Sequence, residues 1–162
     1  MKTSGLLLSM LIFLNVSLTA AHPSHSPIFE ILDIVSLEKI PIVKCQINGI
    51  EAFFVLDSGS DVSLLHSLYA DQYDFSFKKK AHKSIVGLSG GSQSLHIVPE
   101  VKLIANTTQF ETEYYTTDLS TIVESLEKST GFTITGIIGM DIMRKYGFTI
   151  DYASKTARFE QS

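Results

Sequence analysis

Short runs of apolar residues, separated by turn-forming residues, fill the chain after residue 27 and predict a β-rich fold. The pair Asn48-Gly49 lies between two such runs and is the strongest hairpin signal, because both central residues of that turn need positive φ. Residues 52–56 are almost wholly apolar, which predicts a central strand that is buried on both faces. The predicted strands cover residues 29–34, 42–47, 52–56, 84–86, 95–98, 101–105, 110–116, 132–138, 148–152 and 156–160.

Two segments have the period of a helix instead. In residues 118–128, Thr121 and Glu124 can form a capping box, and Gly131 follows the end of the segment. A shorter helix is predicted at 141–146. The apolar positions of the longer helix are Leu119, Ile122, Val123 and Leu126. The fold class predicted is mainly β, a small closed or semi-closed barrel with two short helices.

The composition excludes two classes of protein. Hydrophobic residues make up 44% of the 162 residues, which supports a compact core and excludes a disordered chain. The formal net charge is −4, and the one run of three basic residues is Lys78–Lys80. We therefore predict no nucleic-acid partner.

The start of the chain has the layout of a secretory signal peptide. A positive start at Met1-Lys2 precedes an apolar stretch over residues 5–14, and the small residues at 19–21 offer a cleavage site. An uncleaved membrane anchor is the alternative, but a spanning helix needs about 20 mostly apolar residues. We expect a signal peptide at 1–21, a linker at 22–27 and a folded domain at 28–162. This protein would be exported, either secreted or periplasmic, with no stable membrane anchor after cleavage.

Cysteine and histidine carry no predicted site. Cys45 is the one cysteine, so no internal disulfide can form, and its apolar neighbours favour a small buried side chain over a nucleophile. His22 and His25 lie in the predicted linker, and the other histidines lack the spacing of metal ligands. We predict neither a metal nor another cofactor.

An acidic residue, Asp57, directly follows the apolar run 52–56. A carboxylate at the end of a buried strand is costly unless it is hydrogen-bonded or functional. Gly59 lets the chain turn tightly and brings its N–H toward the acid, while Ser58 and Ser60 add hydroxyl donors. On these residues alone, a plain turn explains the segment as well as an active site does.

Three features in order make the chain resemble the retropepsin-like aspartic proteases. Asp57-Ser58-Gly59 is similar to the Asp-Thr/Ser-Gly active-site motif of that family, and it follows a hairpin with an Asn-Gly turn. The glycine-tipped hairpin around 87–91 resembles the family's flap. Ile137-Ile138-Gly139 resembles the apolar pair and glycine that lie beside the catalytic loop. The resemblance covers residues 28–160.

The resemblance implies an aspartic endopeptidase that needs no metal and no covalent intermediate. Two carboxyls about 3 Å apart cannot both ionise, so they share one proton and together activate a water for attack on a peptide bond. The chain holds a single Asp-Ser-Gly, since Asp141 and Asp151 precede other residues. The second Asp57 must then come from another copy, and we expect a homodimer acting on peptide or protein substrates.

The resemblance also implies roles for neighbouring residues. Ser58 would hydrogen-bond across the dimer axis, and Gly59 would contact the substrate or the acid. Asp61 would either anchor the substrate backbone or form a hydrogen bond that stabilises its own loop. The glycine-rich hairpin would close over the peptide as a lid. The residues expected to bind substrate are Asp61, Gly87, Leu88, Ser89, Gly90 and Ile137.

Two departures from the family pattern affect these expectations. Ser60 stands where retroviral members usually have Ala, and a hydroxyl donor to the carboxylate would favour an acidic optimum. Met140 stands where they often have an Arg, which puts their usual dimer contacts in doubt. A non-catalytic member that holds peptides in its groove is the alternative function.

Overall fold

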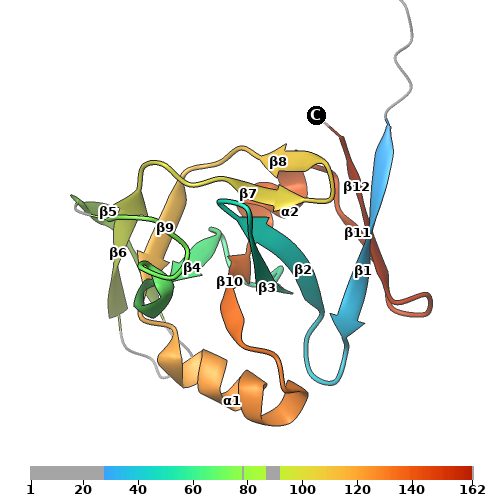
Figure 1. Cartoon of the computed structure of the whole chain (residues 1–162), viewed down its shortest axis with the longest axis horizontal. Coiled ribbons are helices and arrows are strands. Elements are labelled where there is room, and N and C mark those ends of the chain that lie inside the picture. The colour runs from blue at the N-terminus through green and yellow to red at the C-terminus, as the bar shows by residue number, and fades with distance from the viewer. Residues whose placement is uncertain (1–27, 78, 87–91, 162) are drawn as a thin grey trace, which may run out of the picture.

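The computed structural model describes residues 28–77, 79–86 and 92–161. Figure 1 shows a mainly β fold with the α1 helix at one end of the molecule. The strands are β1 (Phe29–Ser36), β2 (Ile42–Ile47), β3 (Ile50–Leu56), β4 (Leu64–His66), β5 (Lys79–Val86), β6 (Ser92–Val98), β7 (Leu103–Ala105), β8 (Thr108–Phe110), β9 (Tyr114–Thr117), β10 (Ile134–Ile138), β11 (Thr149–Asp151) and β12 (Thr156–Glu160). The helices of the described residues are α1 (Ser120–Thr130) and α2 (Met140–Lys145), and a 3-10 turn lies at Ser67–Tyr69.

The sheet is open, so the mainly β fold with two short helices is confirmed, but the closed form of the predicted closed or semi-closed barrel is not. Its strands follow the order β11-β12-β1-β2-β3-β10-β4-β9-β6-β5, and β7 and β8 branch from β2. A closed barrel requires the first and last strands of this order to pair. Instead, β11 and β5 lie on opposite sides of the molecule (Figure 1).

Three strands at the centre of the sheet position the loop that follows β3. β10 pairs with β3 in parallel, with Leu56 opposite Ile138, and pairs with β4 in the antiparallel sense. A side chain at Gly136 would put its Cβ 2.3 Å from the carbonyl oxygen of Leu64 and 2.6 Å from Cε1 of Phe54. Glycine is therefore required for β10 to fit between its two neighbours.

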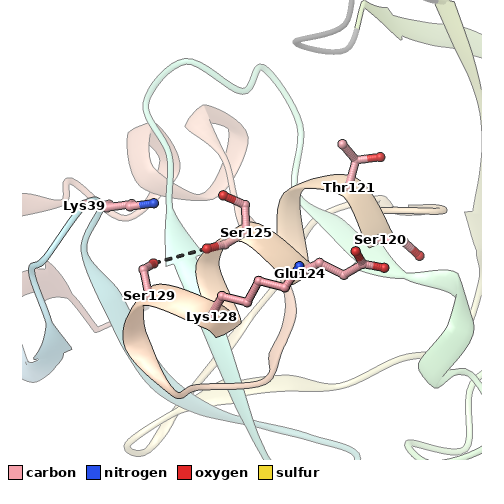
Figure 2. Close-up of a pocket in the computed structure, with 7 residues that line it drawn as sticks. All are labelled: Lys39, Ser120, Thr121, Glu124, Ser125, Lys128 and Ser129. Atoms are coloured by element: carbon pink, nitrogen blue, oxygen red, sulfur yellow. Dashed lines mark hydrogen bonds between the residues drawn. The ribbon is translucent and has the colours of Figure 1, made fainter.

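The α1 helix begins two residues later than predicted, and its cap differs. Leu119 is its N-cap residue and makes no side-chain cap, so the expected capping box of Thr121 and Glu124 does not form. The Asp118 carboxylate instead accepts hydrogen bonds from the N–H and hydroxyl of Ser120. The helix also ends two residues later than predicted, at Thr130, but the expected C-terminal glycine is confirmed, because Gly131 caps the helix with a left-handed φ of 74°. The outer flank of α1 is polar and lines an open depression of about 560 Å³ with Lys39 (Figure 2).

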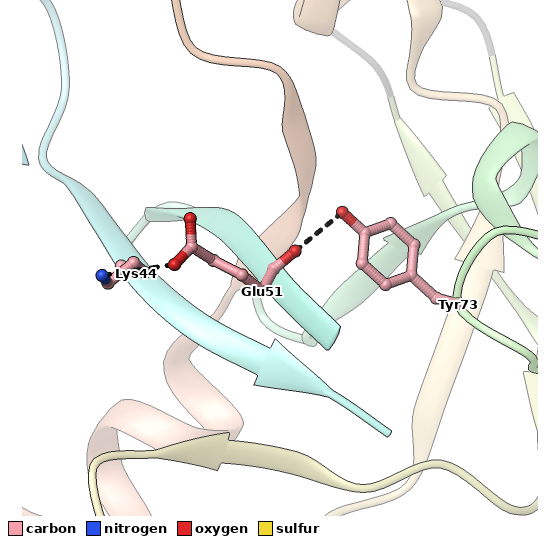
Figure 3. Close-up of polar contacts among 3 residues, drawn as sticks. All are labelled: Lys44, Glu51 and Tyr73. Atoms are coloured by element: carbon pink, nitrogen blue, oxygen red, sulfur yellow. Dashed lines mark hydrogen bonds and ion pairs between the residues drawn. The ribbon is translucent and has the colours of Figure 1, made fainter. Parts of the chain in front are cut away.

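The β2–β3 hairpin forms at the predicted turn, where φ is 50° at Asn48 and 86° at Gly49. The hairpin is held to the segment after the 3-10 turn, because the Tyr73 hydroxyl donates to the carbonyl oxygen of Glu51 over 3.1 Å (Figure 3). The Glu51 carboxylate also lies 3.3 Å from the Lys44 ammonium group. More than half of each of these two side chains is exposed, so the ion pair contributes at most about 1 kcal/mol.

Buried apolar side chains form two groups, one on each side of β3. Phe54 belongs to the larger group, where the Phe110 and Phe159 rings also meet with centroids 5.3 Å apart. Val55, the next residue, belongs to the smaller group under α1. This alternation confirms that β3 is buried on both faces, as its apolar run predicts.

The predicted signal peptide and linker lie outside the described residues, so these boundaries stay predictions. Among the described helices, none combines the length and hydropathy that a membrane crossing requires.

Candidate active site

The backbone of Asp57 continues the pairing of the central strands beyond the end of β3. The Leu56 N–H donates to the carbonyl oxygen of Pro41 over 2.9 Å, and the Asp57 N–H donates to that of Ile138 over 3.0 Å. Leu56 is buried, whereas Asp57 is partly exposed. The strand therefore delivers a carboxyl group from the core to the surface.

The loop after Asp57 turns back on the carboxyl group. The Gly59 N–H donates to Asp57 Oδ1 over 2.9 Å, and the Ser60 N–H donates to the Asp57 carbonyl oxygen over 3.2 Å. The first of these bonds fixes the orientation of the carboxyl group. Ser58 and Gly59 are exposed at the tip of the turn, where they are accessible to another molecule.

Ser60 does not act as the sequence predicts. Its hydroxyl donates to the carbonyl oxygen of Val62 over 2.7 Å, so its one proton is not given to the Asp57 carboxylate. The expectation that this hydroxyl binds the acid is therefore wrong. The acidic optimum inferred from it loses its physical basis.

Gly139 lies close against the loop from the other side. A Cβ at this position would lie 2.5 Å from the carbonyl oxygen of Val62 and 2.8 Å from that of Ser60. The next residue, Met140, donates its N–H to the same Ser60 oxygen over 2.8 Å. The carboxyl end of β10 and the start of α2 thus hold the Asp57 loop, which explains the sequence pattern of an apolar pair followed by glycine.

A buried hydroxyl connects these two segments. Ser63 is 1% exposed, and its Oγ accepts from the Gly139 N–H over 3.0 Å and donates to Asp141 Oδ1 over 2.7 Å. The other oxygen, Asp141 Oδ2, accepts from the Thr112 hydroxyl over 3.0 Å. No role is predicted for Ser63 or Thr112, because nothing local in the sequence marks one serine or threonine as the partner of a distant acid.

The remaining predicted site residues have different placements. Ile137 is buried in β10 and lines, together with Asp57, an apolar cavity of about 190 Å³. Asp61 is exposed and borders a separate depression beside Arg144 and Lys145 of α2. β5 and β6 pair antiparallel, as a flap hairpin would. The flap residues Gly87, Leu88, Ser89 and Gly90 lie outside the described residues, so their roles stay predictions.

The other two acids considered for catalysis are engaged elsewhere. Both Asp141 oxygens accept hydroxyl hydrogen bonds, and Asp151 Oδ1 accepts the N–H groups of Ala153 and Ser154 in the β11–β12 turn. In the part of the chain that the structure describes, no three His, Cys, Asp or Glu side chains gather as metal ligands would.

The chain is similar to known proteins in its sequence pattern and in its fold. The sequence pattern of the retroviral aspartyl protease family matches residues 37–151. Among solved structures, the EIAV protease in complex with the inhibitor HBY-793 has a TM-score of 0.51 at 23% identity, covering 68% of this chain and 90% of its own. A retropepsin-like aspartic protease from Rickettsia conorii has a TM-score of 0.50 at 13% identity, covering 85% of this chain and 96% of its own.

A third structure, the retroviral protease-like domain of Ddi1 from Leishmania major, has a TM-score of 0.46 at 16% identity and covers 70% of this chain and 82% of its own. None of the curated proteins compared with the chain matches it. The family match extends from the loop before β2 to the end of β11, and so includes every segment that surrounds Asp57. The chain therefore belongs to the retroviral aspartyl protease family.

Proposed function

We propose that the protein is an aspartic endopeptidase, active as a homodimer in which Asp57 of each copy supplies one of two catalytic carboxyls. One observation carries the proposal. The Asp57 carboxyl is partly exposed at the end of a buried strand, is oriented by the Gly59 N–H, and borders an apolar cavity. A fixed acid beside a pocket is the arrangement that acid–base hydrolysis requires.

The chemistry needs a second carboxyl beside the first. Two carboxyls about 3 Å apart hold one proton between them, because both cannot ionise at that distance. The ionised group takes a proton from a water, which then attacks the carbonyl carbon of the peptide bond. The protonated group polarises the carbonyl oxygen and later helps to protonate the leaving amine.

A second copy of the chain is the source that the geometry favours. Asp141 and Asp151 are both occupied by hydrogen bonds elsewhere in the fold. Asp141 in α2 accepts from the distant hydroxyls of Ser63 and Thr112, and Asp151 accepts backbone N–H groups of its own turn. The exposed turn of Ser58 and Gly59 lies beside Asp57, so a two-fold axis at this turn would bring the two acids together. In such a dimer, the Ser58 hydroxyl is available to bond across the axis.

Hydrolysis of unfolded casein, measured from acid to neutral pH, tests the activity. Asp57→Asn should lower the rate of hydrolysis by about 10²- to 10⁴-fold, the range expected for losing a general acid–base group. The matched control is Asp74→Asn, because Asp74 is an exposed acid with a left-handed φ of 51° that Asn also tolerates. Equal activity of the two variants would refute the assignment, and cleavage by neither the wild type nor the control would favour the peptide-binding alternative.

Mixing active and inactive chains tests the paired acids separately. If activity needs one Asp57 from each copy, co-refolding wild type with an equal amount of Asp57→Asn protein leaves about one quarter of the dimers with two acids, by random pairing. The activity per wild-type chain should then fall by about half. Unchanged activity per wild-type chain, or a monomer by light scattering at active concentrations, would contradict the dimer.

A further inference from the structure

The α1 helix closes one side of the apolar cavity beside Asp57, and this cavity is a break in an otherwise dense core. Protein interiors contain few voids larger than a water molecule. This one has a volume of about 190 Å³ and lies within the smaller group of buried apolar side chains. Its floor is made of six buried residues: Val55, Leu119, Val123, Leu126, Ile134 and Ile137.

The mouth of the cavity is formed by residues that are not fully buried. Ile40, Asp57 and Ile122 are partly exposed, and Lys39 is exposed. The void therefore opens to the surface at the candidate catalytic acid. Lys39 also borders the polar depression on the outer flank of α1 (Figure 2), so its apolar stem can line the mouth while its ammonium group stays in water.

The size and chemistry of the cavity define what it can hold. A dry apolar cavity of about 150 Å³ accepts a benzene ring. A cavity of about 190 Å³ thus has room for one Leu, Met or Phe side chain. The floor residues offer no charged partner, so a charged side chain would lose its hydration without compensation.

We propose that α1 is the specificity-determining element of the proposed protease, with Ile122 at the mouth limiting the size of the single large apolar substrate side chain that enters beside Asp57. The inference rests on the proposed function for its substrate class, which is peptides. Four of the lining residues come from α1 or the residue before it, whereas β3 and β10 supply the remaining buried floor. A change on α1 should therefore alter selectivity without displacing the Asp57 loop, which is held by β10 and α2.

Binding of small amides tests the cavity independently of hydrolysis. N-acetyl-leucinamide and N-acetyl-phenylalaninamide should shift the methyl NMR resonances of Val55, Leu126 and Ile137, whereas N-acetyl-glycinamide should not. Ile122→Phe should weaken binding by about 10- to 200-fold, the range for misfit in an apolar pocket. Thr121→Phe places the same new side chain on the outer flank of the helix, where Thr121 is drawn in Figure 2, and should leave binding unchanged.

Cleavage profiles of a peptide mixture test the same residue during hydrolysis. Wild type should favour Leu, Met or Phe next to the cleaved bond, Ile122→Ala should move the preference to larger side chains, and Ile122→Phe to Ala or Val. Equal binding of all three amides, or equal effects of Ile122→Phe and Thr121→Phe, would overturn the inference. Selective binding of the amides without cleavage would support the proposed role of the cavity and count against the proposed protease function. Cleavage with the same profile in all variants would support the protease function and contradict the role of Ile122.

Discussion

The Asp57 N–H donates to the carbonyl oxygen of Ile138 over 3.0 Å, and this bond joins two segments that are far apart in the sequence. It extends the parallel pairing of β3 and β10 by one residue beyond the strands themselves. The candidate catalytic acid therefore has its position set by β10 as well as by its own strand. Changes at the end of β10 should accordingly affect Asp57.

Gly139→Ala should destabilise the fold and impair catalysis together. The new Cβ would meet the carbonyl oxygens of Val62 and Ser60 at 2.5 and 2.8 Å, and both are backbone atoms that move only with the loop. We expect a loss of about 1–3 kcal/mol in the free energy of unfolding, the usual cost of overpacking, measured by urea denaturation.

Gly131→Ala is the control for that experiment. Gly131 has a left-handed φ of 74° and open space around its Cβ position, so alanine there should cost about 1 kcal/mol through backbone strain alone. Casein hydrolysis should survive in Gly131→Ala and fall in Gly139→Ala. An equal loss of activity in both would show that stability, not the position of the Asp57 loop, limits the rate.

Ser63→Ala should be among the most destabilising single-atom changes near the site. It removes the acceptor of the Gly139 N–H and the donor to Asp141 Oδ1, and leaves the backbone group buried without a partner. Such a loss costs about 1–3 kcal/mol. Thr112→Val removes another bond to Asp141 but strands no buried backbone group, so its unfolding free energy should fall by less. A larger loss in Thr112→Val would contradict this account.

Local patterns predict most elements of this fold because their causes are local. The Asn48-Gly49 turn, the Gly131 cap and the double burial of β3 all follow from residues within each segment. The β4 strand (Leu64–His66) was missed, because three residues are too few to show a period. The predicted strand at 110–116 covers only the last residue of β8 and the first three residues of β9, since residues 111–113 leave the sheet.

The site is less predictable because its contacts join distant segments. Three serines at 58, 60 and 63 look equivalent in the sequence, yet Ser60 bonds Val62 and Ser63 bonds Gly139 and Asp141. Which oxygen each hydroxyl reaches depends on the approach of β10 to the loop. The apolar stripe of α1 likewise follows from its period, but the void beneath it depends on how α1 lies against β10.

The Cys45 thiol should be unreactive in the folded protein. It is 3% exposed in β2, and burial raises its pKa to about 12, so the nucleophilic thiolate is scarce at pH 8. Labelling by a disulfide reagent should be slow in buffer and fast in urea. Ser154→Cys places a thiol in the exposed β11–β12 turn and should react at once, as a positive control. Equal rates for the two thiols in buffer would contradict the burial of Cys45.

His66 should make the fold less stable as the solution is acidified. It is 2% exposed, and its Nδ1 accepts the N–H of Leu119, the residue before α1, over 3.3 Å. Burial lowers the pKa of His66 below its usual 6.5, although Asp118 and a backbone hydrogen bond with Thr117 oppose the shift. The unfolded chain then takes up a proton at a higher pH than the folded chain does.

The contribution of neutral His66 to the free energy of unfolding is therefore fully present above pH 6.5. It declines as the pH falls through that value toward the lower pKa of the folded state. His66→Gln cannot titrate, so its free energy of unfolding should vary less with pH in this window, by up to about 1.4 kcal/mol per pH unit. Urea denaturation of both proteins at several pH values measures the two slopes. Identical slopes would show that His66 binds its proton equally well in the folded and unfolded chains, and that the start of α1 is indifferent to its charge.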